Sequence, residues 1–170
     1  MTVPLLAIAA WSGTGKTTLL EKVIPLLRDR GIRSGLIKHT HHHMDVDTPG
    51  KDSYLLRKAG ADQVIVASNQ RWALMCETPD EPLNLHQLAA RMDHALLDLV
   101  LVEGFKDEPV AKIVLWRTGV KGAIADLLDD YVIAVASDVE SALPIPVLDI
   151  NQPQQIADFI AEWCFSQKNP

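Results

Sequence analysis

The chain has 170 residues, of which 48% are hydrophobic and 22% are charged, as expected for one globular domain with a sizeable core. Its net charge of −6 argues against a general nucleic-acid binder and against a membrane-surface protein. The N-terminus lacks a signal-peptide pattern, and no apolar run approaches the ~20 residues that span a bilayer. We therefore expect a cytoplasmic protein that has no nucleic-acid or membrane partner.

A glycine-rich stretch near the N-terminus separates an apolar run from a helical pattern. The run from Leu5 to Ala10 predicts a strand buried on both faces, and apolar residues recur at helical spacing from Lys16 to Arg30. The stretch between them is Ala10-Trp11-Ser12-Gly13-Thr14-Gly15-Lys16-Thr17. It matches the Walker A pattern, with Ala10 in place of the first glycine. Backbone N–H groups of such a loop, and the positive end of the helix that follows, hold a phosphate group.

This loop provides the predicted nucleotide site. We expect Lys16 to reach the β- and γ-phosphates and the Thr17 hydroxyl to hold Mg²⁺. The predicted nucleotide-binding residues of the loop are Ser12, Gly13, Thr14, Gly15, Lys16, Thr17 and Thr18. A glycine-rich turn that binds nothing is the alternative, which the flanking strand and helix disfavour.

A histidine-rich segment follows the predicted strand Ile32 to Lys38. Four of the six histidines of the chain lie between His39 and His43, and Asp45 and Asp47 come shortly after. One hypothesis is a transition-metal site, because imidazole and carboxylate groups are common ligands. Adjacent histidines on a loop rarely reach one ion, so we favour a polar loop beside the nucleotide that positions phosphate or substrate.

A β-hairpin is predicted at about residues 63–77, appended to the main fold. Its strands are Gln63 to Ser68 and Arg71 to Glu77, joined by a two-residue turn in which Asn69 takes a left-handed conformation. Trp72 and Met75 of this hairpin are either core or interface residues. We slightly favour an interface, since exposed apolar patches usually mark contacts.

Four helical segments are predicted in addition to the one after the loop, and one of them is a short segment from Ala123 to Leu128. Lys51 to Ala59 forms a short helix, and a second presents Leu85, Leu88, Ala89 and Met92 on one face. A terminal helix opens at Asn151 and packs one stripe into the core, made of Ile156, Phe159, Ile160, Trp163 and Cys164. Cys76 and Cys164 lie far apart in apolar surroundings, which predicts two buried thiols and neither a disulfide nor a metal knuckle.

A predicted buried strand, Leu97 to Val102, ends directly before Glu103. Ligands of open α/β folds bind at the carboxyl edge of the sheet, so Glu103 is the leading candidate for the carboxylate partner of Mg²⁺. Lys16 and Glu103 are accordingly the candidate catalytic residues. Asp98 lies at the opposite end of the strand, which favours a structural role.

The alternation of strands and helices predicts a three-layer α/β fold with a mainly parallel sheet. Further strands are predicted at Ala111 to Trp116, Tyr131 to Ala136 and Pro146 to Ile150. The whole chain, residues 1–170, is interpreted as one P-loop nucleotide-binding domain that carries the hairpin as an excursion.

Four segments together resemble a known family: AWSGTGKTT, LIKHTHHHMDVDTPGKDSY, LVEGFK and AVASD. Over nearly its whole length the chain is similar to the molybdopterin-guanine dinucleotide biosynthesis adaptor proteins, the MobB family. The resemblance implies a P-loop protein that binds GTP and Mg²⁺, hydrolyses GTP weakly and forms a homodimer. It also implies that the protein assists the guanylyltransferase that attaches GMP to the molybdenum cofactor, with molybdopterin as a further ligand. Enzymes of the larger class carry a signature lysine early in the loop, where this chain has Trp11.

Related GTP-binding folds have an acidic residue that reads guanine where Asp138 stands, after the run from Val132 to Ala136. A carboxylate accepts hydrogen bonds from both N1–H and the 2-amino group of guanine, and such charge-assisted bonds are roughly twice as strong as neutral ones. The alternative, a helix-capping aspartate before Val139, remains open.

Two other functions compete with the adaptor. A small-molecule kinase would use cations that close on the γ-phosphate, for which Arg57 and Lys106 are candidates. A metal-delivery GTPase would store its metal on the cluster from His39 to His43.

Overall fold

The computed structural model describes residues 3–40 and 44–168, and the chain divides into two compact units. The larger unit comprises Met1–His39 and Leu85–Pro170, and the smaller unit comprises Thr40–Asn84. The hairpin predicted at about 63–77 lies within the smaller unit, together with a helix and the segment that leads into it.

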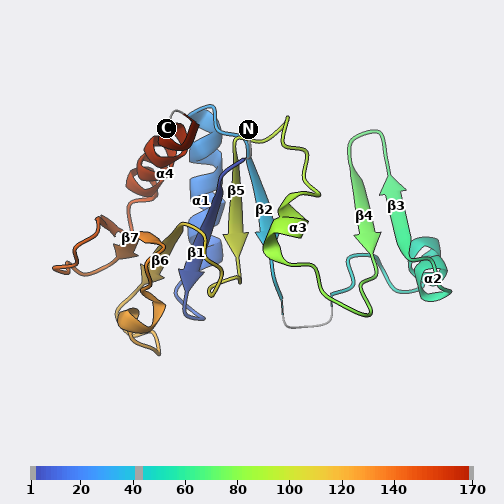
Figure 1. Ribbon diagram of the computed structural model, residues 1–170, viewed down its shortest axis with the longest axis horizontal. Helices are drawn as coiled ribbons and strands as arrows, with labels where there is room; N and C mark the ends of the chain where they lie inside the picture. Colours follow the sequence, from blue (N-terminus) through green and yellow to red (C-terminus); the bar gives the residue numbers. More distant parts are fainter. Residues whose placement is uncertain (1–2, 41–43, 169–170) are drawn as a thin grey trace. The chain divides into compact units, whose positions relative to one another are not determined.

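A six-stranded parallel sheet forms the centre of the larger unit, with strand order β2-β5-β1-β6-β7-β8 (Figure 1). The predicted parallel α/β sheet is thereby confirmed. Its strands are β1 (Leu5–Ala10), β2 (Ser34–Lys38), β5 (Leu99–Glu103), β6 (Lys112–Trp116), β7 (Val132–Ser137) and β8 (Val147–Asp149).

Helices cover both faces of this sheet because side chains along each strand alternate between the faces. Helices α1 (Lys16–Asp29) and α4 (Pro153–Lys168) pack on one face. Helix α3 (Leu85–Ala89) and the 3₁₀ turn η1 (Ile124–Leu127) contribute to two smaller clusters on the other face. The larger unit therefore has the predicted three layers.

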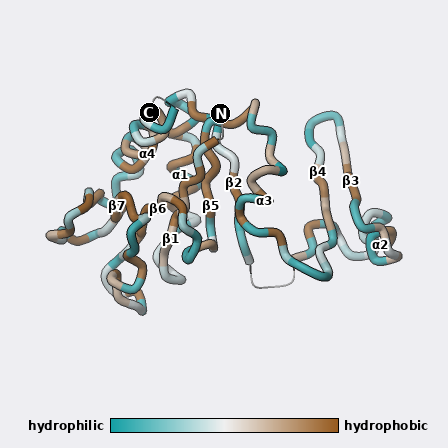
Figure 2. The backbone as a smooth tube through the Cα atoms, viewed as in Figure 1, coloured by the Kyte–Doolittle hydropathy of each residue, from teal (hydrophilic) through white to brown (hydrophobic). Residues whose placement is uncertain are grey.

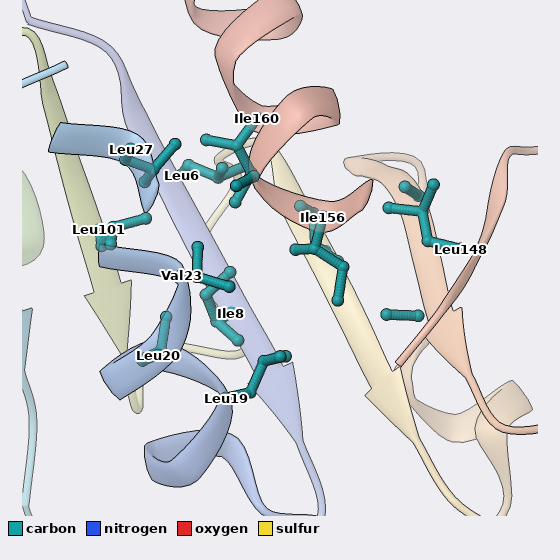
Figure 3. Close-up of a cluster of buried hydrophobic side chains, with 14 of the residues drawn as sticks. Leu6, Ile8, Leu19, Leu20, Val23, Leu27, Leu101, Leu148, Ile156 and Ile160 are labelled. Atoms are coloured by element: carbon teal, nitrogen blue, oxygen red, sulfur yellow. The ribbon is translucent and has the colours of Figure 1, made fainter. Parts of the chain in front are cut away.

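The main core lies between the sheet and the pair of helices α1 and α4 (Figure 3). Leu6 and Ile8 of β1 point into it, and burial of each such side chain contributes about 1.5–3 kcal/mol. The predicted stripe on α4 is confirmed, since Ile156, Ile160 and Cys164 are fully buried. The helical residues labelled in Figure 3 are Leu19, Leu20, Val23 and Leu27 of α1, and Ile156 and Ile160 of α4.

Asp98, just before β5, has the predicted structural role. Its carboxylate accepts hydrogen bonds from the backbone N and Nε of Arg33 and from Nζ of Lys168, at 2.9, 3.0 and 2.7 Å. Lys168 and then Arg33 hold the pKa of Asp98 well below its usual range. The start of β5 is thus tied to the last turn of α4.

The predicted helix face from Leu85 to Met92 is wrong at its end, because α3 stops at Ala89. Arg91 N and Met92 N donate to carbonyls three residues back, and the His94 ring donates to the Ala89 carbonyl. These bonds satisfy the end of the helix and turn the chain away. Met92 still packs against the same apolar cluster from beyond the helix.

The smaller unit contains helix α2 (Asp52–Lys58) and an antiparallel hairpin of β3 (Gln63–Ala67) and β4 (Trp72–Cys76). The hairpin was predicted, but its turn geometry was not. Positive φ among the described residues occurs at glycines alone, so Asn69 is not left-handed. Instead, the Ser68 hydroxyl oxygen accepts hydrogen bonds from the backbone N–H groups of Gln70 and Arg71, which closes the turn without that conformation.

Cys76 is exposed at the end of β4, so the prediction of two buried thiols is wrong for this residue and correct for Cys164. The apolar neighbours of Cys76 in the sequence are largely exposed as well. A two-stranded sheet buries few of its side chains. This explains why Cys76 is exposed although its neighbours in the sequence are apolar.

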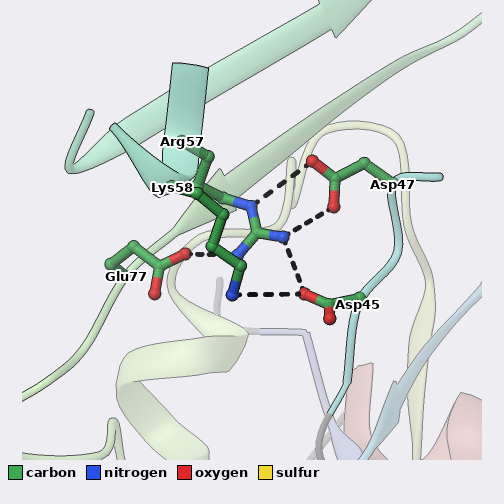
Figure 4. A network of polar contacts seen from close by, with 5 residues as sticks. All are labelled: Asp45, Asp47, Arg57, Lys58 and Glu77. Atoms are coloured by element: carbon green, nitrogen blue, oxygen red, sulfur yellow. Dashed lines mark hydrogen bonds and ion pairs between the residues drawn. The ribbon is translucent and has the colours of Figure 1, made fainter. Parts of the chain in front are cut away.

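A network of ion pairs around Arg57 holds the smaller unit together (Figure 4). The guanidinium of Arg57 contacts the carboxylates of Asp45, Asp47 and Glu77 at 2.7, 2.7 and 2.6 Å. Its hydrogen bonds, first to Asp47, raise the pKa of Arg57 and lower the pKa of Asp47. Lys58 lies at the rim, 3.9 Å from Asp45.

We expect Arg57→Ala to destabilise the smaller unit, because three carboxylates lose their shared cation. Lys58→Ala is the matched control, which removes an exposed cation at the rim and leaves the unit intact. Urea titration, followed through the amide NMR signals of β3 and β4, measures both effects.

The pH dependence of stability provides a second test of the ion pair between Asp47 and Arg57. The folded pKa of Asp47 lies below its usual value of 3.8, so its pairing stabilises the unit above that value and is lost as pH falls through the lowered pKa. The difference in the free energy of unfolding of the smaller unit between wild type and Arg57→Ala should therefore be largest at pH 7. It should shrink below about pH 4. A gap that stays constant down to pH 2 would contradict this assignment.

Candidate phosphate-binding site

The order of the strands brings the two predicted halves of the site together. β1 and β5 are neighbours, with Ile8 opposite Glu103, so both strands end at the same edge of the sheet. The loop that follows β1 and the carboxylate that ends β5 therefore meet at the carboxyl edge, where open α/β sheets bind ligands.

The predicted loop joins β1 directly to α1. Gly13 and Gly15 have φ values of 84° and 90°, in the left-handed region that glycine adopts without strain. Thr14 between them is buried, and its backbone N and hydroxyl both donate to the Trp11 carbonyl, at 3.3 and 2.7 Å. The two glycines and this internal bonding fix the turn that leads into the N-terminus of α1, where a phosphate is stabilised.

Lys16 and Glu103, the predicted catalytic pair, are in contact. Lys16 Nζ lies 3.3 Å from Glu103 Oε1, and Lys38 Nζ at the end of β2 lies 3.6 Å from the same oxygen. Glu103 is only 9% exposed. A largely buried carboxylate is thus shared by two lysines, one of which starts the helix at the predicted phosphate site.

The other predicted binding residues of the loop, Ser12, Gly13, Thr17 and Thr18, are exposed. Thr17 lies in the first turn of α1, and Glu103 ends the strand beside β1. A hydroxyl and a carboxylate are hard oxygen ligands of the kind that Mg²⁺ prefers. The donor set of these two residues therefore fits Mg²⁺.

Trp11 has a structural role that sequence reasoning missed. Its Nε1 donates to the Ala123 carbonyl at 3.0 Å, and Lys106 Nζ lies 5.9 Å from the centre of its ring. A Cβ on Gly122 would come within 2.5 Å of the ring. The indole is therefore held against the loop after β6. The sequence showed Trp11 only as a departure from the signature lysine.

Lys112 is a second residue whose role was missed, because it was included in an apolar strand. It is fully buried at the start of β6. Its Nζ contacts the Asp129 carboxylate at 2.6 Å and the Lys106 carbonyl at 2.7 Å. A lysine at the start of an apolar strand was the signal in the sequence. It anchors the segment that follows Glu103.

Asp138 lies at the predicted strand end, but its carboxylate is engaged by the loop after β6. Both oxygens accept from Thr118 N, at 2.9 and 3.2 Å, and one also accepts from the Thr118 hydroxyl. Residues 139–146 form no helix, so the helix-cap interpretation is wrong. Asp138 braces the Thr118 loop, and a role in reading guanine stays a prediction.

The histidine-rich segment is described in part. His39 continues the ladder beside β5, since its N–H donates to the Glu103 carbonyl at 2.8 Å, and its ring lies 5.0 Å from that of Phe105. His41, His42 and His43 lie outside the described residues. Within residues 3–40 and 44–168, no group of three or more His, Cys, Asp or Glu side chains is arranged to hold a metal ion. The metal hypothesis for the full cluster stays untested.

The parallel sheet, the glycine-rich loop between β1 and α1, and the acidic end of the neighbouring strand define a P-loop nucleoside triphosphatase fold. The family model described as molybdopterin guanine dinucleotide synthesis protein B, MobB, matches residues 5–138. The chain belongs to the MobB family, which confirms the resemblance inferred from its segments.

Relatives and solved structures agree with this assignment. The molybdopterin-guanine dinucleotide biosynthesis adapter protein of Escherichia coli K12 is 65% identical over 97% of this chain and 95% of its own length. The protein of that name from Haemophilus influenzae is 52% identical over 95% and 89%. A crystal structure of molybdopterin-guanine biosynthesis protein B has a TM-score of 0.76 at 26% identity, covering 94% of this chain and 99% of that one. A MobB homologue from Bacillus stearothermophilus has a TM-score of 0.73 at 25% identity, covering 95% and 98%.

Within the part of the chain that the structure describes, no helix combines the length and apolar character that crossing a membrane requires.

Proposed function

We propose that this chain is a GTP-binding adaptor in the formation of molybdopterin guanine dinucleotide. The observation that carries the proposal is the contact between Lys16 and Glu103 beside the phosphate loop, in a chain 65% identical to an adapter protein of that pathway. The GTP phosphates lie on the loop from Ser12 to Thr18, with Lys16 at the β- and γ-phosphates. The protein acts in the cytoplasm on the guanylyltransferase that joins GMP to the molybdenum cofactor, with molybdopterin as a further ligand.

Mg²⁺ is the second proposed cofactor, held by Thr17 and Glu103. When bound, the ion neutralises charge on the phosphates. The protein hydrolyses GTP weakly, because a carboxylate that holds Mg²⁺ is a poor acceptor for the proton of an attacking water. Slow turnover suits an adaptor, which needs the nucleotide to stay bound while its partner works.

The kinase alternative loses support from the two cations on which it depended. Arg57 is buried and occupied by three carboxylates within the smaller unit. Lys106 lies over the Trp11 ring, and its carbonyl is held by Lys112. A kinase needs such cations to close on the γ-phosphate of its substrate. We therefore do not propose it.

The proposed homodimer is supported by an apolar face on the hairpin. Ile65 lies opposite Leu74, and Ala67 opposite Trp72, so these side chains share one face of the two-stranded sheet. Trp72 is 67% exposed and Ile65 is 64% exposed. Hydrophobic residues occur in both strands (Figure 2). An isolated hairpin is marginally stable, so a second copy that covers this face stabilises both.

Replacing Lys16 tests nucleotide binding. We expect Lys16→Ala to reduce GTP affinity at least about a hundredfold, since the loop loses its point charge at the phosphates. The fold should be retained, because Glu103 keeps its pair with Lys38. Calorimetric titration and thermal unfolding measure the two effects, with Lys51→Ala as a control. Unchanged affinity in the folded variant would sink the phosphate-loop assignment.

Replacing Glu103 tests the metal. Glu103→Gln removes the charge with little change in shape, so GTP affinity in Mg²⁺ should fall at least about tenfold. Affinity without Mg²⁺ should hold or rise, because Lys16 is freed from its ion pair. Titrations with Mg²⁺ and with EDTA separate the two. Equal losses under both conditions would assign Glu103 a purely structural role.

Replacing Trp72 tests the dimer. A charge in the centre of the apolar face should weaken self-association at least about tenfold in Trp72→Glu. Gln70→Glu adds the same charge at the turn and should leave association unchanged. Sedimentation equilibrium of the full chain measures both variants. If Trp72→Glu remains as dimeric as wild type, the second copy does not pack on this face.

A further inference from the structure

A small pocket of about 230 Å³ opens beside the phosphate loop, within the larger unit. It is smaller than the roughly 300–1,000 Å³ of pockets that hold a whole drug-sized ligand, and its size suits a single heterocycle. Gly15 and Thr18 belong to the predicted phosphate site and also line this pocket, so a nucleotide whose phosphates lie on the loop has its base within reach of it. The polar lining side chains are those of Thr18, Lys22, Arg117 and Asn151.

Arg117 fixes the orientation of the Asn151 side chain. Its Nη1 donates to Asn151 Oδ1 at 2.8 Å, and its Nε donates to the Thr14 carbonyl of the phosphate loop at 3.3 Å. A guanidinium has donors and no acceptor, so the amide oxygen of Asn151 must face it. The NH₂ group of Asn151 is consequently the part left for a ligand.

The polar groups that line the pocket are therefore mainly donors. Lys22 and Arg117 carry N–H donors alone, Asn151 offers its NH₂, and Thr18 offers a hydroxyl. None of the described residues that line the pocket is acidic. Guanine presents two acceptors, O6 and N7, along one edge, whereas adenine presents the N6 amino donor beside N7. This lining fits the guanine edge and opposes the adenine amino group.

We infer that this pocket receives the guanine base, that Asn151 reads its O6/N7 edge, and that Arg117 is the residue that positions Asn151. The inference rests on the proposed GTP binding and assigns the base specificity of that site. It differs from the prediction that Asp138 reads guanine, because Asp138 would contact N1–H and the 2-amino group of the base instead. The two oxygens of Asp138 accept hydrogen bonds from Thr118.

Nucleotide analogues test this with the unaltered protein. ITP has the same O6 and N7 atoms as GTP and lacks the 2-amino group. We expect ITP to bind within about threefold of GTP, and ATP at least about tenfold more weakly, because the pocket reads only the edge that GTP and ITP share. ITP binding as weak as that of ATP would overturn the inference in favour of an acceptor at the 2-amino position.

The matched variants are Asn151→Asp and Gln152→Glu. Asn151→Asp still accepts from Arg117 but replaces the NH₂ donor with an acceptor, so the ratio of GTP to ATP affinity should fall at least about tenfold. Gln152→Glu adds the same charge one residue along, outside the pocket lining, and should leave the ratio unchanged. Calorimetry with Mg²⁺ gives the affinities. If Asn151→Asp does not fold, the analogue series decides alone.

The outcomes separate the inference from the proposed function. GTP binding with an unchanged GTP to ATP ratio in folded Asn151→Asp overturns the base pocket and leaves the GTP-binding adaptor standing. Failure of the wild-type chain to bind any of the three nucleotides overturns the proposed function itself.

Discussion

The site depends on the placement of one carboxylate beside one lysine. Glu103 reaches Lys16 because β5 lies directly next to β1, and this neighbour relation places a strand end and a helix start at the same edge of the sheet. Lys38 adds a second cation from β2, on the other side of β5. Two strands and the start of a helix, which are separate in sequence, thus supply one charge cluster, and any displacement of β5 would dismantle it. Asp98 resists that displacement by tying the far end of the segment to Arg33 and Lys168.

Different interactions stabilise the two units. The larger unit has a layered apolar core around a parallel sheet, which the hydrophobic effect stabilises. The smaller unit presents many of its apolar side chains to solvent and is held internally by the charges around Arg57. Electrostatic pairing orients groups well but supplies little net stability, because each charge loses its hydration on burial. The smaller unit is therefore the part of the chain best suited to gain stability from a partner.

The sequence predicted the elements that follow from local patterns. Buried runs gave the strands, helical spacing gave α1 and α4, and the loop with Gly13 and Gly15 was recognisable because its chemistry is contiguous. The roles that it did not reveal depend on contacts between distant segments. Lys112 was interpreted as part of an apolar strand. Its partner Asp129 lies between η1 and β7, and the residues next to Lys112 do not reveal this pairing. Whether the Cys76 thiol is buried depends on whether other parts of the protein cover the hairpin. The residues next to Cys76 in the sequence do not determine this.

The burial of Lys112 constrains how this sequence can change over evolutionary time. Loss of Asp129 alone would leave the buried ammonium group of Lys112 with the Lys106 carbonyl as its one hydrogen-bond partner among the described residues, and loss of Lys112 alone would release the segment after Glu103. Single substitutions at either position pass through a destabilised intermediate. The two positions should therefore vary together among relatives, and a lineage that replaces both with apolar residues must find another way to hold the chain beyond Glu103.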